Sequence, residues 1–478
     1  MPASRSTTCV GATWRRWGRF PGGWFGRGTG HGWLPLLFLP LAALAPVAGA
    51  VPSVLVGAES PAVASALSLP QLISEVLAHS PQIQAKAAEI RAAAERPLQV
   101  RTPDDPMLMI ELWQVPIGAA HIPIMLSLRQ PLTWPGKLSA RAAVLSHDRA
   151  FAQAELSTSE KDLRLAAARG YFDYRLAVRS LEVLSAARAI AMALVAAVDV
   201  RYRVGRAELA ELLAAQESLA VLDNLLLDAG RERDLAQAAL NVLRSQPSDA
   251  RLGNPTTVPS LRALPTLDSL RAQALRGRPE LLALDSQIAQ ADARRLAAAK
   301  ERAPDLALSF SYMATLHPGA PAEHNFTAGL QTSLPSFSLL RAAAQGREAL
   351  AQRQALQAQR RQREQEIEGQ LQAALLRAET ALRHMRFHAG TLLPLSERSL
   401  RAAQAGYQSG RVPLSLLLET ARRLVEHQLE FERYQAELGQ RLAELEAESG
   451  LPLLSGAPAE QEATVGPANS AVRAGGIP

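Results

Sequence analysis

The sequence has 478 residues, 48% hydrophobic and only 5% aromatic, which is enough for a large core and favours a mainly α-helical chain. Its formal net charge of +6 lies largely in residues 1–50, which hold five arginines and no acidic residue. Without those five, 46 basic residues face 45 acidic ones, a net charge of +1 that gives no electrostatic argument for binding nucleic acid.

Residues 1–50 have the pattern of a secretory signal peptide. Basic residues precede an apolar run over 33–47, and Ala48-Gly49-Ala50 offers small residues for cleavage before Val51. The alternative, a transmembrane anchor, is disfavoured because the run is shorter than about 20 residues and contains three prolines. The only cysteine, Cys9, lies in this leader, so we expect an exported chain without disulfides or thiolate sites. After the leader we expect no apolar helix long enough to span a bilayer.

The next part of the chain predicts two short helices, a strand pair, a long helix and a return helix. Ser68 can cap the first short helix, and Ser80-Pro81 can start the second, which is expected to end before Pro97. Apolar and polar residues alternate over 122–129, which is the period of a β-strand. The expected segments are a linker over 51–66 and a first unit over 67–245, with a β-hairpin over 106–132, the long helix over 135–203 and the return helix over 207–243.

The long helix is the most distinctive segment. No strong helix breaker occurs from Pro135 to Tyr202, and at about 1.5 Å per residue this length gives a helix on the order of 100 Å. Its apolar residues form two rows with seven-residue spacing, roughly 200° apart around the helix: Val144, Phe151, Leu165 and Phe172 in one, and Leu156, Leu163, Ala177 and Leu184 in the other. Two opposed seams indicate a helix flanked on both sides, as in the wall of a tube. The alternative is a helix inside a thick bundle.

The same order of elements then appears again. Arg278-Pro279 opens a helix 198 residues after Ser80-Pro81, and the turn at Tyr202–Gly205 matches Tyr407–Gly410 at an offset of 205. Such self-similarity indicates one structural unit written twice. The expected segments are a linker over 246–265, a second unit over 266–450 and a disordered tail over 451–478; the second unit has a β-hairpin over 304–334, a long helix over 340–408 and a return helix over 413–448.

The four expected strands are about nine to eleven residues long, which is the length of a tilted strand that crosses a bilayer. Two hairpins cannot close a barrel, and open edges cannot face lipid because their N–H and C=O groups would be unpaired. Strands in a membrane would therefore need several chains to share one barrel, and three chains would supply twelve strands. The alternative is a soluble protein in which the hairpins pack on the helices.

The leader, the duplicated unit, both Tyr-x-x-Gly turns and the corner Gln130–Leu138 between strand and long helix resemble the outer-membrane efflux protein family typified by TolC. The similarity covers about residues 67–450. The resemblance implies a mainly α protein with a small transmembrane β part: a homotrimer whose α-barrel crosses the periplasm below a twelve-stranded β-barrel in the outer membrane of a Gram-negative bacterium. It also implies a periplasmic adaptor and an inner-membrane pump as partners. The corner residues singled out are Pro131, Trp134, Pro135 and Gly136.

The resemblance places both turns at the periplasmic tip, where the adaptor docks. The residues concerned are Tyr202, Gly205 and Arg206 in the first turn, and Tyr407, Gly410 and Arg411 in the second. The family archetype narrows its pore with acids six and nine positions after the second glycine, where this chain has Leu416 and Glu419. Glu208 and Glu211 follow the first glycine and could add to such a pore constriction. The alternative for all three glutamates is a solvated helix face.

His384 and His388, four residues apart on a helix, could bind a metal ion, but no third ligand is near in sequence and we expect a solvated face. Pro394 is expected to bend the second long helix. We find no phosphate loop, nucleophile elbow or pair of catalytic acids, so no enzyme activity, cofactor or metal is assigned. The expected function is a passive exit duct of a tripartite efflux system for drugs, metal ions or other small molecules. The alternative is the periplasmic adaptor, which normally has one helical hairpin rather than two.

Overall fold

The computed structural model describes residues 66–112, 122–258, 264–316, 319, 321–334 and 336–454. The chain divides into two units, Met1–Pro61 and Ala62–Pro478, and every described residue belongs to the second. The expected leader, the linker before residue 66 and the tail after residue 454 therefore lie outside the described residues.

The first copy of the repeat, expected over 67–245, begins with α1 (Leu69–His79) and α2 (Pro81–Arg101). Ser68 and Ser80 precede them as helix caps, and the Ser80 hydroxyl accepts a hydrogen bond from the Ile83 N–H at 3.5 Å. The expectation that the second helix ends before Pro97 was wrong, because α2 continues through this proline to Arg101. A proline inside a helix costs about 3 kcal/mol. Packing along α3 offsets that cost, and Arg96, one position before the proline, pairs with Asp148 of α3 at 2.9 Å.

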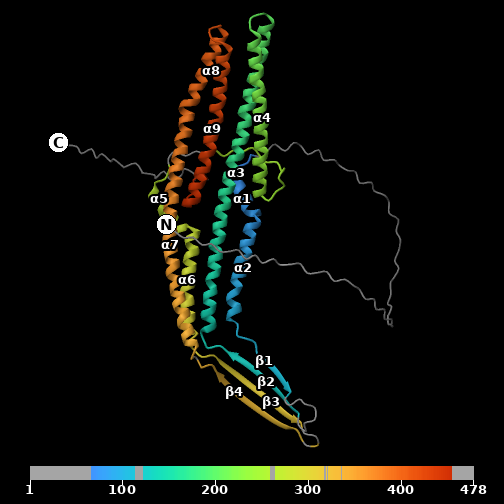
Figure 1. Ribbon diagram of the computed structural model, residues 1–478, viewed down its shortest axis with the longest axis vertical. Helices are drawn as coiled ribbons and strands as arrows, with labels where there is room; N and C mark the ends of the chain where they lie inside the picture. The colour runs from blue at the N-terminus through green and yellow to red at the C-terminus, as the bar shows by residue number, and fades with distance from the viewer. Residues whose placement is uncertain are drawn as a thin grey trace, which may run out of the picture. The chain divides into compact units, whose positions relative to one another are not determined.

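The long helix α3 (Lys137–Arg203) has neighbours along its whole length. It packs against α2 and α6 (Pro279–Lys300) over one half, and against α4 (Leu209–Leu243) and α9 (Leu414–Ser449) over the other (Figure 1). One seam residue, Phe172, is fully buried, and a second from the other row, Leu184, is 3% exposed. Both predicted rows of apolar residues therefore contribute to packing.

The second long helix contains one irregular turn. It runs through α7 (Ser338–Phe387), a π-helical turn η1 (His388–Leu392) and α8 (Leu393–Gln408) without a break, so helical residues cover the expected range 340–408. Pro394 has no N–H to donate to the preceding turn. The turn before it widens instead, and the Leu393 N–H donates to the His388 carbonyl, five residues back.

The strands form one antiparallel sheet in the order β1-β2-β3-β4: β1 (Met107–Leu112), β2 (Ile122–Leu132), β3 (Leu306–Leu316) and β4 (Glu323–Thr332). The two hairpins join because β2 pairs with β3 over its whole length. One face of the sheet is apolar and exposed, with its side chains in register across the strands: Leu126, Leu128, Leu308, Phe310, Phe326 and Leu330. Strands β1 and β4 are the two edges, and neither has a second partner among the described strands.

Three apolar clusters hold the helices together. One joins α1, α3, α4 and α9 around Tyr171 and Phe172, and the Tyr171 hydroxyl donates to the Leu67 carbonyl at 3.1 Å. A second joins α7 and α9 with α5 (Leu267–Gly277) and α6 around Leu371 and Leu442. The third joins the turn-bearing ends of α3, α4, α8 and α9. Contacts between the two units of the repeat therefore recur along the helices.

Candidate functional site

The two Tyr-x-x-Gly turns have the same backbone geometry. Gly205 and Gly410 adopt φ values of 68° and 69°, a region that costs a residue with a Cβ about 1–2 kcal/mol. In each turn the residue after glycine donates its N–H to a carbonyl five residues back, Arg206 at 2.8 Å and Arg411 at 2.8 Å. Open space surrounds both glycines, so the backbone angle and not crowding requires them.

Both turns lie at the same end of the helices (Figure 1), and side chains connect them. Tyr407 is 9% exposed and belongs to the apolar cluster there, and the Arg201 guanidinium carbon of α3 lies 4.7 Å from its ring centroid. A cation over an aromatic face is attractive. Tyr202 is 39% exposed, and Arg206 and Arg411 are also exposed. The tip thus offers an exposed tyrosine and two exposed arginines, while the second tyrosine is internal.

The three candidate pore glutamates differ in their surroundings. Glu208 is the exposed N-cap of α4, and Glu211 is half-buried in its first turn. Glu419 of α9 accepts hydrogen bonds from Arg423 at 2.8 Å and from Arg422 at 3.0 Å. Hydrogen bonds from these guanidinium groups hold the pKa of Glu419 below its ordinary value. The sequence interpretation missed both arginines, although their spacing of three and four residues from Glu419 on a helix indicates the contact.

An ion pair between a buried lysine and a partly exposed aspartate connects the strand-to-helix corner to the second copy of the repeat. Gly136 adopts a φ of 91° and caps α3 directly before Lys137, whose side chain is 3% exposed. The Lys137 ammonium lies 2.9 Å from Asp305 Oδ1, and the Trp134 N–H donates to the same oxygen at 3.2 Å. Pro131 pairs with Ala307 of β3, and Pro135 is exposed. Lys137 and Asp305 were not singled out from the sequence, because their pairing spans 168 residues.

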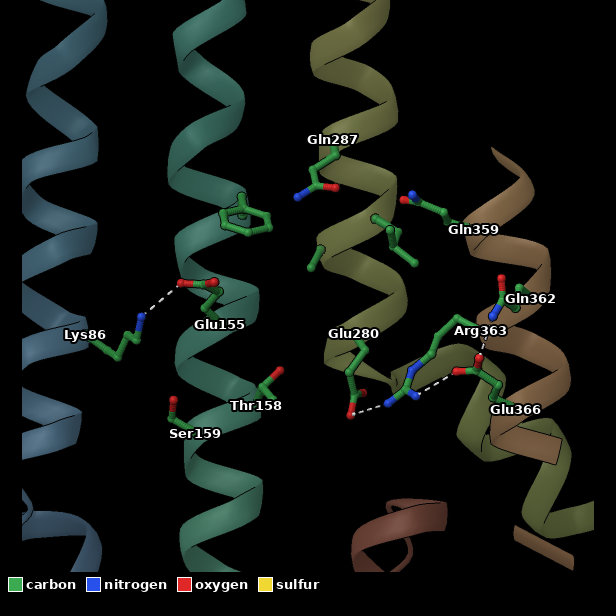
Figure 2. Close-up of a pocket in the computed structure, with 13 residues that line it drawn as sticks. Lys86, Glu155, Thr158, Ser159, Glu280, Gln287, Gln359, Gln362, Arg363 and Glu366 are labelled. Atoms are coloured by element: carbon green, nitrogen blue, oxygen red, sulfur yellow. Dashed lines mark hydrogen bonds and ion pairs between the residues drawn. The ribbon is translucent and has the colours of Figure 1, made fainter. Parts of the chain in front are cut away.

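A polar groove of about 610 Å³ lies on the strand-proximal half of the helices. Figure 2 shows its lining, which comes from α2, α3, α6 and α7: Lys86, Phe151, Glu155, Thr158, Ser159, Glu280, Ala283, Leu284, Gln287, Gln359, Gln362, Arg363 and Glu366. These helices pack as a row, because α2 contacts α3, α3 contacts α6 and α6 contacts α7. Side chains from the first and the last helix of a row can line one groove only where the row curves around it. The groove therefore lies on the concave side of the helix layer.

Ion pairs cross this groove. Lys86 of α2 lies 3.0 Å from Glu155 of α3, and Arg363 of α7 lies 3.7 Å from Glu280 of α6 and 3.1 Å from Glu366 (Figure 2). The lining combines these charged side chains with the apolar Phe151, Ala283 and Leu284. Sequence analysis did not identify this groove, since its members come from four helices in both halves of the chain.

Glu280 is the most buried acid of the groove, with a side chain 16% exposed. Its Oε1 is paired with Lys161 of α3 and lies 3.4 Å from Arg278 and 3.7 Å from Arg363. Burial opposes ionisation, but Lys161, the residue's own N–H and Arg278 together hold the pKa of Glu280 below its ordinary value. Glu280 is thus a charged junction of α3, α6 and α7.

The two candidate histidines differ in exposure. His384 is exposed, but His388 is only 6% exposed, because the π-helical turn lies against α9 and the His388 ring packs on Tyr434. The solvated-face expectation was therefore wrong for His388. Among the residues that the structure describes, no group of three or more His, Cys, Asp or Glu side chains is arranged to hold a metal ion.

One described helix is apolar and long enough to cross a membrane by composition, so the expectation of no such helix was wrong. It is α3, and only 11% of its most apolar 18-residue stretch is buried. Its exposed apolar side chains include Ile190 at 60% and Val200 at 61%. The described part of the chain leaves this apolar surface uncovered.

Comparison with known proteins identifies related folds. Residues 270–451 match the family model described as "Outer membrane efflux protein". The chain is similar to the solved outer-membrane channel OprN, with 18% identity and a TM-score of 0.65 over 81% of this chain and 90% of that one. It is similar to the outer membrane protein VceC of Vibrio cholerae, with 18% identity and a TM-score of 0.64 over 80% and 96%. The chain is also similar to the solved structure of CusC, with 17% identity and a TM-score of 0.65 over 80% of this chain and 91% of that one. No curated protein matches the chain.

Proposed function

Since the chain carries an outer membrane efflux protein domain over residues 270–451 on the fold of outer-membrane channels, we propose that it is the outer-membrane channel of a tripartite efflux system. The observation that carries the proposal is the four-stranded sheet, which has an exposed apolar face and two edges without a partner among the described strands. This sheet is attached to helices on the order of 100 Å long. Unpaired strand edges cannot face lipid. Three copies joined edge to edge give a twelve-stranded barrel in the outer membrane.

The helices continue this barrel as a tunnel in the periplasm. The concave, polar side of the α2–α3–α6–α7 row faces the lumen, and neighbouring copies cover the exposed apolar residues of α3 and α4. Examples on α4 are Leu227 at 75% and Val242 at 69% exposure. This arrangement accounts for the apolar surface of α3 without a helical membrane span, because a neighbouring helix removes it from water as lipid would.

The chain supplies a passive duct, and partners supply energy and selectivity. The exposed Tyr202, Arg206 and Arg411 dock a periplasmic adaptor, which connects the tip to an inner-membrane pump. The cargo is a drug, a metal ion or another small molecule. The alternative role of periplasmic adaptor is disfavoured, because the helical hairpin occurs twice and the similar solved structures are outer-membrane channels.

A conductance measurement tests the pore assignment. If Glu208 and Glu419 line the constriction, the double variant Glu208→Ala/Glu419→Ala loses part of the cation preference of the channel in planar bilayers, because two negative charges per chain leave the lumen. The matched control is Glu397→Ala, which removes an exposed acid of α8 that is not one of the candidate pore glutamates. This variant is expected to keep the wild-type selectivity. Equal selectivity in the double variant and the wild type would remove both glutamates from the pore.

A further inference from the structure

The hairpin formed by α7, η1, α8 and α9 has a polar gap in its packing. Toward the tip, the buried residues of the cluster shared with α5 and α6 end at Leu382 on α7 and Leu438 on α9. The cluster at the turn-bearing ends of the helices begins at Ala403 on α8 and Leu417 on α9. Between these limits several polar and aromatic side chains face one another across the hairpin: His384, His388, His427, Glu430 and Tyr434. Among the described residues, no fully buried member of either apolar cluster lies between these limits.

The imidazole rings in the gap are close to one another and to one carboxylate. His384 and His388 lie on Tyr434, with ring centroids 5.1 and 4.6 Å away. The His427 ring meets His388 edge-on at 6.5 Å. The same Glu430 oxygen lies 3.2 Å from His427 Nδ1 and 3.9 Å from His388 Nδ1. His388 Nδ1 is buried and has no hydrogen-bond partner in the described part of the chain.

The charges around His388 disfavour its protonated form. The groups that act on it are His384 from its own helix, and His427 and Glu430 from α9. Burial lowers the pKa of His388, and the two neighbouring histidines lower it further against the opposing effect of Glu430. Full protonation would place three positive charges around one carboxylate. The neutral ring is therefore the form that fits the closed packing.

The backbone at this level is also the one that can bend. The π-helical turn His388–Leu392 is followed after one residue by Pro394, which has no N–H to donate, so the regular hydrogen-bond pattern of an α-helix is interrupted here. Kinks in long helices occur at prolines and π-bulges. The segment beyond, α8 with residues 414–426 of α9, is called the tip arm here and carries the second tip turn.

We propose that the cluster of His384, His388, His427 and Glu430 is a proton-operated hinge of the tip arm. Near neutral pH the His388 ring is uncharged and stays packed against Tyr434, and the arm keeps its angle. Because burial lowers the pKa of His388, a proton is added to this ring only in acid below the ordinary histidine value of about 6.5. Like charges then separate His388 from His427 and His384, and the arm turns at η1. The hinge is a property of the helical hairpin and does not require transport.

Distance measurements on spin-labelled protein test the hinge. In a Cys9→Ser background, cysteines replace the exposed Gln216 on α4 and Arg398 on α8, and the full chain in detergent is diluted with unlabelled chain. We expect a longer distance to gain population between pH 7.5 and pH 4.5, a range that extends well below the ordinary histidine pKa, and to lose it when neutral pH is restored. His388→Gln cannot be protonated, so this shift is lost. His79→Gln, a histidine of α1 outside the cluster, keeps it.

If His388→Gln fails to fold, His384→Gln and His427→Gln take its place in the test, because their rings are less buried. Each of these variants is expected to reduce the shift. Identical distance distributions of the wild type at the two pH values would overturn the proposal. So would a shift that persists in the folded histidine variants. A shift caused by Zn²⁺ or EDTA at constant pH 7.5 would assign the cluster to metal binding and would equally overturn a proton-operated hinge.

Discussion

Glu280 lies where α3, α6 and α7 meet, and its single carboxylate faces cations from three directions. Lys161 comes from α3, Arg278 precedes α6 and Arg363 comes from α7. A buried acid with such partners contributes chiefly through the cost of leaving the partners unpaired. At this junction, one residue fixes the relative position of three helices that are far apart in sequence.

Glu280→Gln should lower the free energy of unfolding at pH 7 by about 1–3 kcal/mol, since the cations lose their charged partner. The pKa of Glu280 is lowered in the folded chain, so its stabilising effect is present above the ordinary value of 4.5 and is lost as pH falls below it. Thermal unfolding followed by circular dichroism in detergent, from pH 7 to pH 3, should show the two proteins converge in acid.

The exposed acid Glu95 of α2 provides the control. Glu95→Gln should change stability by less than about 0.5 kcal/mol, as for other surface positions. A gap between wild type and Glu280→Gln that stays constant from pH 7 to pH 3 would show that the carboxylate charge does not stabilise the fold.

At the level of helices, α9 approaches α3 so closely that only glycine fits. A Cβ on Gly439 would lie 2.5 Å from Cζ and 2.6 Å from Cδ1 of the buried Phe172 ring. Gly369 of α7, in contrast, has open space around it. Alanine substitutions at these two glycines therefore distinguish the effect of crowding on stability from the effect of helix propensity.

Gly439→Ala should destabilise the protein by about 1–3 kcal/mol, because overpacking at the Phe172 ring exceeds the gain of about 1 kcal/mol in helix propensity. Gly369→Ala should instead stabilise it by up to about 1 kcal/mol. Chemical unfolding of both variants measures the difference. A Gly439→Ala protein as stable as Gly369→Ala would contradict the close contact between α3 and α9.

The mainly helical fold and its small β part were predictable, because helix and strand periods are local. The turns at Gly205 and Gly410 could also be predicted, because glycine adopts a positive φ without steric cost. The docking role of these turns stays a prediction. What could not be read depends on contacts distant in sequence. Pro97 sits inside α2 because α3 supports that helix, and the Lys137–Asp305 pair forms only once β2 and β3 align. The π-helical turn depends on Pro394 together with packing on α9.

Across the whole molecule, three surfaces are incomplete in a single chain. Among the described strands, β1 and β4 each have one edge without a partner strand; the sheet has an exposed apolar face, and α3 and α4 carry exposed apolar side chains. A closed ring of three chains satisfies all of them: the edges pair, lipid covers the sheet, and neighbouring helices cover α3 and α4. Twelve strands and a polar lumen follow from the same arrangement.

Cross-linking of neighbouring strand edges tests this ring most directly. In a Cys9→Ser background, Ile110→Cys on β1 is combined in turn with cysteines at successive β4 positions 325, 326, 327 and 328, because the pairing register between copies is not fixed by one chain. Facing cysteines of paired strands come within disulfide range. After oxidation, outer-membrane fractions should yield covalent species of up to three chains and no larger, and each single-cysteine variant should yield no closed trimer. A chain that stays monomeric in every combination and is recovered in the soluble periplasmic fraction would contradict the shared barrel.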